Sequence, residues 1–118
     1  MSKLHDLSAS EVNQLLSTHK AELIDVREPP EFEAERIPGA LLFPLSGFDA
    51  AALPKDPGKR LILQCGTGKR SAMAAQRLFA AGYREVSHLS GGIKAWKEAG
   101  LPTIAIDPST GKVQTGRS

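Results

Sequence analysis

Residues 61–82, LILQCGTGKRSAMAAQRLFAAG, join an apolar run to an alanine-rich run through a turn that contains two glycines. The first run, RLILQ at 60–64, is short and apolar, which is typical of a buried strand. The second run consists largely of helix-forming residues and ends at Gly82, as helices commonly do. The only cysteine of the sequence, Cys65, lies between the two runs. The stretch therefore predicts a strand, a loop that begins with a thiol, and a helix.

Short apolar runs and helical segments alternate along the rest of the chain. Ser8 and Glu11 have the spacing of a capping box, which predicts a helix over about 9–18. Further strands are predicted at 22–26, 41–43 and 85–89, and further helices within 27–35 and 91–100. The alternation predicts an α/β fold with a mostly parallel sheet and helices on both faces. Because ligands bind beyond the carboxyl ends of such strands, Cys65 is predicted to lie at a functional edge.

The composition predicts one globular domain without a membrane segment. A chain of 118 residues is long enough for one core and short for two. A net charge of +2 does not favour nucleic acid or membrane as partners, and no apolar run approaches the roughly 20 residues of a membrane span. A single cysteine allows no internal disulfide, and the first residues lack the apolar core of a signal peptide. These features predict a cytoplasmic protein.

The turn CGTGKRS at 65–71 fails to match three common anion-binding loops. A Walker loop aligned on it has Leu63 at the first glycine and Arg70 at the magnesium-binding hydroxyl. A dinucleotide fingerprint has Ser71 at its third glycine. The tyrosine-phosphatase loop, C-x5-R, also needs arginine where this sequence has Ser71, and its arginine clamps phosphate bidentately. Nucleotide and phosphate chemistry are therefore disfavoured.

The remaining interpretation is a loop whose backbone N–H groups surround the Cys65 sulfur. Gly66 and Gly68 permit the backbone conformations and the close approach that such a loop needs. The N-terminal end of the following helix and the cations Lys69 and Arg70 also favour a thiolate over a thiol. The alternative is that Cys65 is a small residue of the core, as many isolated cysteines are.

Four stretches of the sequence resemble signatures of the single-domain rhodanese family of sulfurtransferases. The segment LIDVREPPEFEAERIPGA resembles the N-terminal signature, CGTGKRS the active-site loop, and AAQRLFAAGYREVSHLSGG and IKAWKEAGLP the closing segments. The residues that carry the match outside the loop are Asp25, Arg27, Glu28, Glu31, Phe32, Ile37, Pro38, Gly39, Ala40, Gly82, Tyr83, Leu89, Gly91, Gly92, Trp96, Gly100 and Pro102. The resemblance runs in the family's order from about residue 4 to 103, and implies a five-stranded central sheet.

The loop departs from the family's pattern at one position and agrees with it in length. The family commonly has arginine directly after the cysteine, where this sequence has Gly66, and Arg36 replaces a histidine of the N-terminal signature. In this family the sulfurtransferases have the shorter loop, sized for a persulfide, whereas related phosphatases and arsenate reductases have one residue more. The loop from Cys65 to Ser71 resembles the shorter form.

The resemblance implies sulfur transfer through a Cys65 persulfide, with no cofactor. The Cys65 thiolate attacks the outer sulfur of thiosulfate or of another sulfane donor, and the persulfide then passes its sulfur to cyanide, a small thiol or a protein cysteine. Because the sequence has no second cysteine, the acceptor must come from outside the chain. The rhodanese domain is predicted over 1–103, and the polar segment 104–118 is predicted to be a flexible C-terminal extension.

The other loop residues are predicted to assist Cys65. Arg70 binds the anionic donor or orders the loop, unless it is a solvated charge, and Lys69 attracts the donor or is simply exposed. Thr67 and Ser71 hydrogen-bond the sulfur or cap the helix, with capping favoured for Ser71. Gly66 and Gly68 complete the loop.

The polar residues outside the loop are not predicted to act in catalysis. Asp25 and Arg27 follow another predicted strand near the loop, and we expect a structural ion pair or turn contact rather than catalysis. His5, His19 and His88 have no spacing to Cys65 that indicates a base. No histidine, cysteine or carboxylate group has metal-ligand spacing, so no metal is predicted.

Two other functions stay open on the sequence. The chain is a persulfide carrier with little thiosulfate turnover if the loss of the usual arginine at Gly66 removes donor binding. A phosphatase or arsenate reductase is the weaker alternative, because the loop is too short for it.

Overall fold

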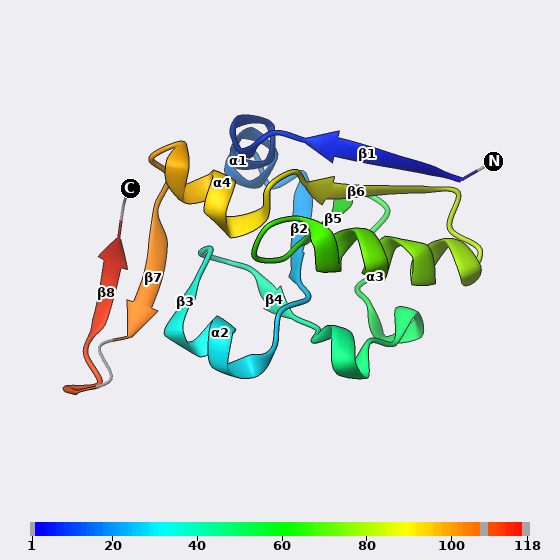
Figure 1. Cartoon of the computed structure of the whole chain (residues 1–118). Coiled ribbons are helices and arrows are strands. Elements are labelled where there is room, and N and C mark those ends of the chain that lie inside the picture. The colour runs from blue at the N-terminus through cyan, green and yellow to red at the C-terminus, as the bar shows by residue number, and fades with distance from the viewer. Residues whose placement is uncertain (1, 107–108, 117–118) are drawn as a thin grey trace.

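The central sheet has five strands and is parallel throughout (Figure 1). The computed structural model describes residues 2–106 and 109–116. In spatial order the strands are β1 (Lys3–Leu7), β6 (Glu85–Leu89), β5 (Arg60–Gln64), β2 (Ala21–Asp25) and β4 (Leu41–Leu42). The predicted α/β class with a five-stranded, mostly parallel sheet is confirmed.

Helices cover both faces of this sheet, as the alternating sequence pattern predicted. On one face α1 (Ala9–Ser17) and α4 (Gly92–Glu98) pack together over a core that contains Trp96. On the other face α3 (Lys69–Ala80) packs against β5 and β6 through its buried alanines and Leu78. The connection from β2 to β5 contains α2 (Pro29–Ala34), strands β3 (Glu35–Arg36) and β4, and two 3-10 turns, η1 (Leu45–Gly47) and η2 (Ala50–Ala52).

The predicted capping box starts α1. The Glu11 backbone N–H donates to Ser8 Oγ at 3.1 Å, and the Ser8 N–H donates to Glu11 Oε1 at 3.0 Å. These two contacts satisfy backbone donors that the first turn of a helix leaves without a partner. The helix ends at Ser17 with Thr18 as its C-cap, and the next residue, His19, has a left-handed φ of 57°. The predicted helix over about 9–18 therefore agrees with α1 to within one residue at its end.

The edge strand β1 was not predicted from the sequence. In KLHDL Leu7 is buried and Leu4 packs against the core partly buried, while Lys3 and Asp6 are exposed. A strand at the edge of a sheet buries little, so its sequence lacks the continuous apolar run that identifies a central strand. β1 pairs with β6 over its whole length, and this register places Asp6 directly beside His88.

Strand register brings the carboxyl ends of β2 and β5 to the same edge of the sheet. Asp25, the last residue of β2, pairs with Gln64, the last residue of β5. The Val26 N–H then donates to the Gln64 carbonyl oxygen at 2.9 Å. Because Cys65 follows Gln64 and Arg27 follows Val26, the two predicted functional segments lie side by side.

A second, three-stranded antiparallel sheet occupies the C-terminal segment. Its order is β3-β7-β8, with β7 at Thr103–Ile106 and β8 at Val113–Gly116 (Figure 1). The sequence predicted a flexible extension over 104–118, but these strands give much of that segment regular structure. β7 pairs with β3, and Thr103 Oγ1 donates to Glu35 Oε2 at 2.5 Å, a partner that no local pattern indicates. Residues 107–108 and 117–118 lie outside the described part, and the domain boundary at 103 stays a prediction.

Candidate active site

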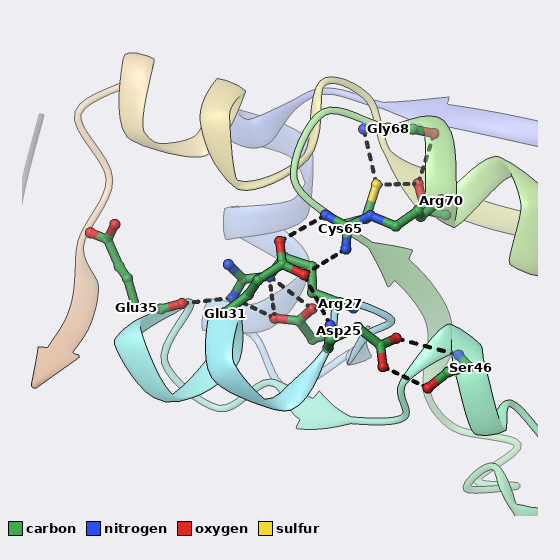
Figure 2. A network of polar contacts seen from close by, with 10 residues as sticks. Asp25, Arg27, Glu31, Glu35, Ser46, Cys65, Gly68 and Arg70 are labelled. Carbon is green, nitrogen blue, oxygen red and sulfur yellow. Dashed lines mark hydrogen bonds and ion pairs between the residues drawn. The ribbon is translucent and has the colours of Figure 1, made fainter.

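Cys65 lies directly after β5, with its sulfur inside the turn that precedes α3 (Figure 2). Its side chain is 1% exposed. The Gly68 backbone N–H donates to Sγ at 3.1 Å, and Ser71 Oγ lies 3.6 Å from Sγ. The predicted arrangement, a sulfur surrounded by loop donors, is present in the structure.

The surroundings of Cys65 favour its thiolate. Burial raises the pKa of the thiol, because a charged sulfur loses hydration. The backbone N–H and hydroxyl of Ser71 and the backbone N–H groups of Gly68 and Thr67 lower that pKa, and together they outweigh the burial. The net pKa of Cys65 therefore lies below its ordinary value, which increases the fraction of nucleophile near neutral pH.

The start of α4 holds the cysteine loop through two backbone hydrogen bonds. The Ile93 N–H donates to the Cys65 carbonyl oxygen at 2.8 Å, and the Lys94 N–H donates to the Gly66 carbonyl oxygen at 3.2 Å. Gly92 makes this contact possible, because a Cβ at that position would overlap the Cys65 carbonyl oxygen and its φ is 61°. The two helices α3 and α4 thus meet at the cysteine loop.

Arg70 is not a solvated charge. Its guanidinium donates to both oxygens of Glu31 on α2, at 2.6 and 2.9 Å (Figure 2). These hydrogen bonds lower the pKa of Glu31 to about 2 and raise that of Arg70. The guanidinium also lies over Gly66, since a Cβ on Gly66 would be 3.2 Å from Arg70 Nη2. Arg70 therefore ties the loop to α2 while keeping a cation beside the site.

The other predicted loop residues differ in exposure. Thr67 and Lys69 are exposed, and Lys69 has no ion pair with any residue in the described part. The expected helix cap at Ser71 is wrong, because Gly68 occupies the N-cap position and α3 already begins at Lys69. Ser71 lies inside the first turn, fully buried, where its hydroxyl is within 3.1 Å of the Gly68 carbonyl oxygen.

Asp25 and Arg27 form a buried ion pair next to the loop. The Arg27 side chain donates to both carboxylate oxygens of Asp25 at 2.9 to 3.1 Å, and the Arg27 N–H donates to Asp25 Oδ1 at 3.0 Å. Arg27 Nη2 also donates to the Glu35 carbonyl oxygen at 2.6 Å. The Asp25–Arg27 contacts hold the turn after β2, and the Glu35 contact joins that turn to the start of β3.

His88 is the polar neighbour of the site that the sequence analysis missed. Its Nδ1 is 2.8 Å from Ser71 Oγ, and its Nε2 is 2.6 Å from Asp6 Oδ1. Helix α3 separates His88 from Cys65 along the chain, and the other partner of His88 lies on β1, the strand that was not predicted. The one available signal was a histidine inside a predicted strand, where an unpaired buried imidazole is costly.

Within residues 2–106 and 109–116, no group of three or more histidines, cysteines or carboxylates is placed to hold a metal ion. No helix of that part is both long and apolar enough to cross a bilayer.

Comparisons with known proteins identify the family of the chain. A family model described as "Rhodanese-like domain" matches residues 8–99. An uncharacterized protein of Synechocystis sp. is 44% identical over 93 residues, which cover 79% of this chain and 52% of that protein. A protein of Allochromatium vinosum named "Sulfurtransferase" is 37% identical over 100 residues, covering 83% of this chain and 92% of that protein.

Solved structures share the fold. The crystal structure of a rhodanese-related protein from Thermoplasma volcanium superimposes with a TM-score of 0.71 at 29% identity, covering 84% of this chain and 96% of that one. The relatives differ in length, since the chain spans about half of the Synechocystis protein.

Proposed function

Because the chain belongs to the rhodanese-like domain family, we propose that it is a sulfurtransferase that carries sulfur on Cys65. The observation that carries the proposal is the thiol at the centre of the loop, with the Gly68 N–H at 3.1 Å and a lowered pKa. A sulfur anion in this position is stabilised by fixed backbone dipoles, which is how a persulfide would be held.

The proposed reaction has two displacements at sulfur. In the first, the Cys65 thiolate attacks the outer sulfur of thiosulfate, the S–S bond of the donor breaks, and sulfite leaves with the electron pair. In the second, cyanide, a small thiolate or a protein thiolate attacks the outer sulfur of the Cys65 persulfide. The S–S bond of the persulfide breaks, and the Cys65 thiolate is regenerated.

The surroundings of Cys65 support roles for two cations in donor binding. Lys69 is exposed at the start of α3, and Arg70 lies over Gly66 beside the sulfur. Both favour the approach of an anionic donor. Because the Arg70 guanidinium also donates hydrogen bonds to Glu31, we assign Arg70 chiefly to ordering the loop. We assign Lys69 chiefly to attracting the donor.

The deciding experiment measures thiosulfate:cyanide sulfurtransferase activity and the intact mass after thiosulfate treatment. We expect turnover and a gain of one sulfur atom on the wild type, and neither with Cys65→Ser. A matched control is the double variant Cys65→Ser and Ser17→Cys, which restores a thiol at an exposed position of α1. Sulfur uptake by that control, or activity of Cys65→Ser alone, would contradict the proposal.

A persulfide carrier is the second candidate, favoured by the pairing of Arg70. With Gly66 lacking a side chain and Arg70 bound to Glu31, Lys69 is left as the unpaired cation of the loop among the described residues. A carrier would accept sulfur from the persulfide of a cysteine desulfurase but turn over thiosulfate poorly. Stable persulfide formation without cyanide turnover would favour this candidate over the enzyme. Rapid hydrolysis of an aryl phosphate would instead favour a phosphatase, which the short loop disfavours.

A further inference from the structure

A chain of polar contacts leads from Cys65 to the surface across three elements. Cys65 Sγ is 3.6 Å from Ser71 Oγ on α3, Ser71 Oγ is 2.8 Å from His88 Nδ1 on β6, and His88 Nε2 is 2.6 Å from Asp6 Oδ1 on β1. Its inner members are buried, whereas the Asp6 side chain is 69% exposed. Neither sulfur displacement described above uses His88 or Asp6, so the chain has no role in that reaction as written.

The partners of His88 determine where its proton lies when the imidazole is neutral. A carboxylate oxygen only accepts hydrogen bonds, so the Asp6 contact places the proton of His88 on Nε2. Nδ1 is then an acceptor, and the hydroxyl of Ser71 donates to it. The Ser71 oxygen in turn accepts from the Cys65 thiol. The hydrogen bonds therefore run in one direction, from the thiol to the carboxylate.

Ser71 has one hydroxyl proton and three neighbours that compete for it. These are His88 Nδ1 at 2.8 Å, the Gly68 carbonyl oxygen at 3.1 Å and Cys65 Sγ at 3.6 Å. While His88 Nδ1 accepts that proton, Ser71 cannot donate to the sulfur. When Nδ1 carries a proton of its own, it donates to Ser71 Oγ, and the Ser71 hydroxyl is free to turn toward a thiolate.

We propose that His88, held by Asp6, is a positioning residue that sets the direction of the Ser71 hydroxyl and stores the proton that Cys65 gives up. The S–H bond of Cys65 breaks as a new O–H bond forms on Ser71, and the original O–H bond of Ser71 breaks as an N–H bond forms on His88 Nδ1. No proton or electron enters or leaves. The products are a thiolate that accepts from Ser71 and an imidazolium that donates to both Ser71 and Asp6.

The groups around His88 suit this exchange. Asp6 faces it from β1, Ser71 faces it from α3, and its register neighbour on β5 is the apolar Leu63. Through Ser71 it meets Cys65 at the end of β5. The imidazolium thus lies between a carboxylate and a thiolate, and each of the two anions stabilises it. Loss of the Asp6 charge should therefore disfavour the thiolate, although Asp6 does not touch the sulfur.

The test compares Asp6→Asn and His88→Asn with the wild type by the rate of Cys65 alkylation with iodoacetamide across pH. We expect both variants to react about 3- to 10-fold more slowly near neutral pH, which corresponds to a rise of 0.5 to 1 in the pKa of Cys65. The matched control is Glu85→Gln, which removes an exposed carboxylate that meets His5 at 3.1 Å on the same two strands. That control should react at the wild-type rate.

A second readout separates proton storage from a merely structural role. Coupling is reciprocal, so the pH titration of the His88 ring nitrogens, followed by NMR, should differ between wild type and Cys65→Ala. Because the Asp6 side chain is exposed, we expect the Asp6→Asn protein to keep the native NMR spectrum. This variant keeps the test valid if His88→Asn unfolds. Wild-type alkylation rates in folded Asp6→Asn, or an unchanged His88 titration in Cys65→Ala, would overturn the proposal. The inference concerns the sulfur of the proposed function, but alkylation needs no sulfur donor, so the two proposals can fail separately.

Discussion

Gln64 is the residue directly before Cys65, and it is fully buried at the end of β5. Neither its Nε2 nor its Oε1 has a hydrogen-bond partner in the part of the chain that the structure describes. A buried amide without partners loses its hydration and gains nothing in return. The unpaired amide of Gln64 therefore lowers the free energy of unfolding of the protein.

We expect Gln64→Leu to raise the free energy of unfolding by about 1–2 kcal/mol, because leucine removes the unpaired amide at a similar volume. Urea denaturation followed by Trp96 fluorescence would measure the change. The control Gln76→Leu alters an exposed residue of α3 and should leave stability nearly unchanged. A loss of stability in Gln64→Leu would mean that the amide has an ordered water or other partner.

The residue scale also shows what a local pattern can predict about the site. The Cys65 loop was identified from the spacing of its own residues, and the structure places the Gly68 N–H on the sulfur. The partner of Arg70, Glu31, is 39 residues away, and no turn or helix pattern connects them. His88 was dismissed because it lies far from Cys65 in sequence, although one serine links the two.

At the scale of single elements, α1 ends in a strained conformation. His19 is the only residue other than glycine with a positive φ in the described part, and the Lys20 N–H after it donates to the Leu15 carbonyl oxygen at 2.9 Å. This left-handed termination usually has glycine, because a Cβ there crowds the backbone.

His19→Gly should therefore stabilise the protein by about 0.5–1 kcal/mol, since it relieves that crowding at an exposed position. Thermal unfolding would detect the change as a higher midpoint. His19→Ala is the informative companion: it keeps the Cβ and should give no gain. Equal stabilisation by both substitutions would show that the histidine side chain, not the backbone, is responsible.

The start of α4 is sensitive in the opposite direction. A Cβ at Gly92 would overlap the backbone of the cysteine loop, so Gly92→Ala should cost about 3 kcal/mol or more and move the loop. Gly47→Ala is the control, because its Cβ would meet nothing within 4 Å. Unfolding in urea and the alkylation rate of Cys65 measure the two effects. A Gly92→Ala protein as stable and as reactive as the Gly47→Ala protein would contradict this account.

Element prediction succeeded where the signal lies in neighbouring residues. Strands β5 and β6 have the predicted bounds, and α1 and β2 agree closely, because apolar runs and a capping box are local features. β1 was missed since it lies at the edge of the central sheet and buries little, and β8, which was also missed, lies at the edge of the small sheet. Helix α3 begins before the expected cap, Ser71. Its N-cap is Gly68, with a φ of 104°, and Ser71 lies inside the first turn.

At the scale of the whole molecule, the Glu31–Arg70 pair joins α2 to the cysteine loop. The pKa of Glu31 is lowered to about 2 from a reference value of 4.5. A carboxylate with a lowered folded-state pKa stabilises the fold above its unfolded value, and this contribution is lost as the pH falls from about 4.5 to about 2. Because the Glu31 side chain is 41% exposed, solvent screening limits the contribution to roughly 0.5–1 kcal/mol.

We therefore expect Glu31→Gln to lower the free energy of unfolding by roughly 0.5–1 kcal/mol at neutral pH and to differ little from wild type near pH 2. Urea titrations of both proteins at several pH values would give the difference curve. Glu33→Gln, an exposed neighbour on α2, serves as the control. A Glu31→Gln difference that is constant with pH would show that the carboxylate charge is not the cause.

The parallel architecture was predictable from the alternation of elements, but the order of the strands was not. Sheet order and register decide that Asp25 meets Gln64 and that Asp6 meets His88. The small β3-β7-β8 sheet depends on the same kind of long-range pairing, with Glu35 beside Ala105. Such contacts are set by the packing of the complete chain, so a single sequence does not display them.

The place of β1 has a consequence for the order in which the molecule is assembled. β1 is bonded in the sheet to β6 alone, and its Asp6 lies 82 residues before His88 in the chain. During synthesis β1 leaves the ribosome long before β6 is made. It cannot pair with β6 along its whole length until residue 89 has emerged. Until then its row of backbone donors and acceptors is open to other chains. The exposed Lys3 and Asp6 place charges on the unpaired strand, which discourages its association with a neighbouring nascent chain.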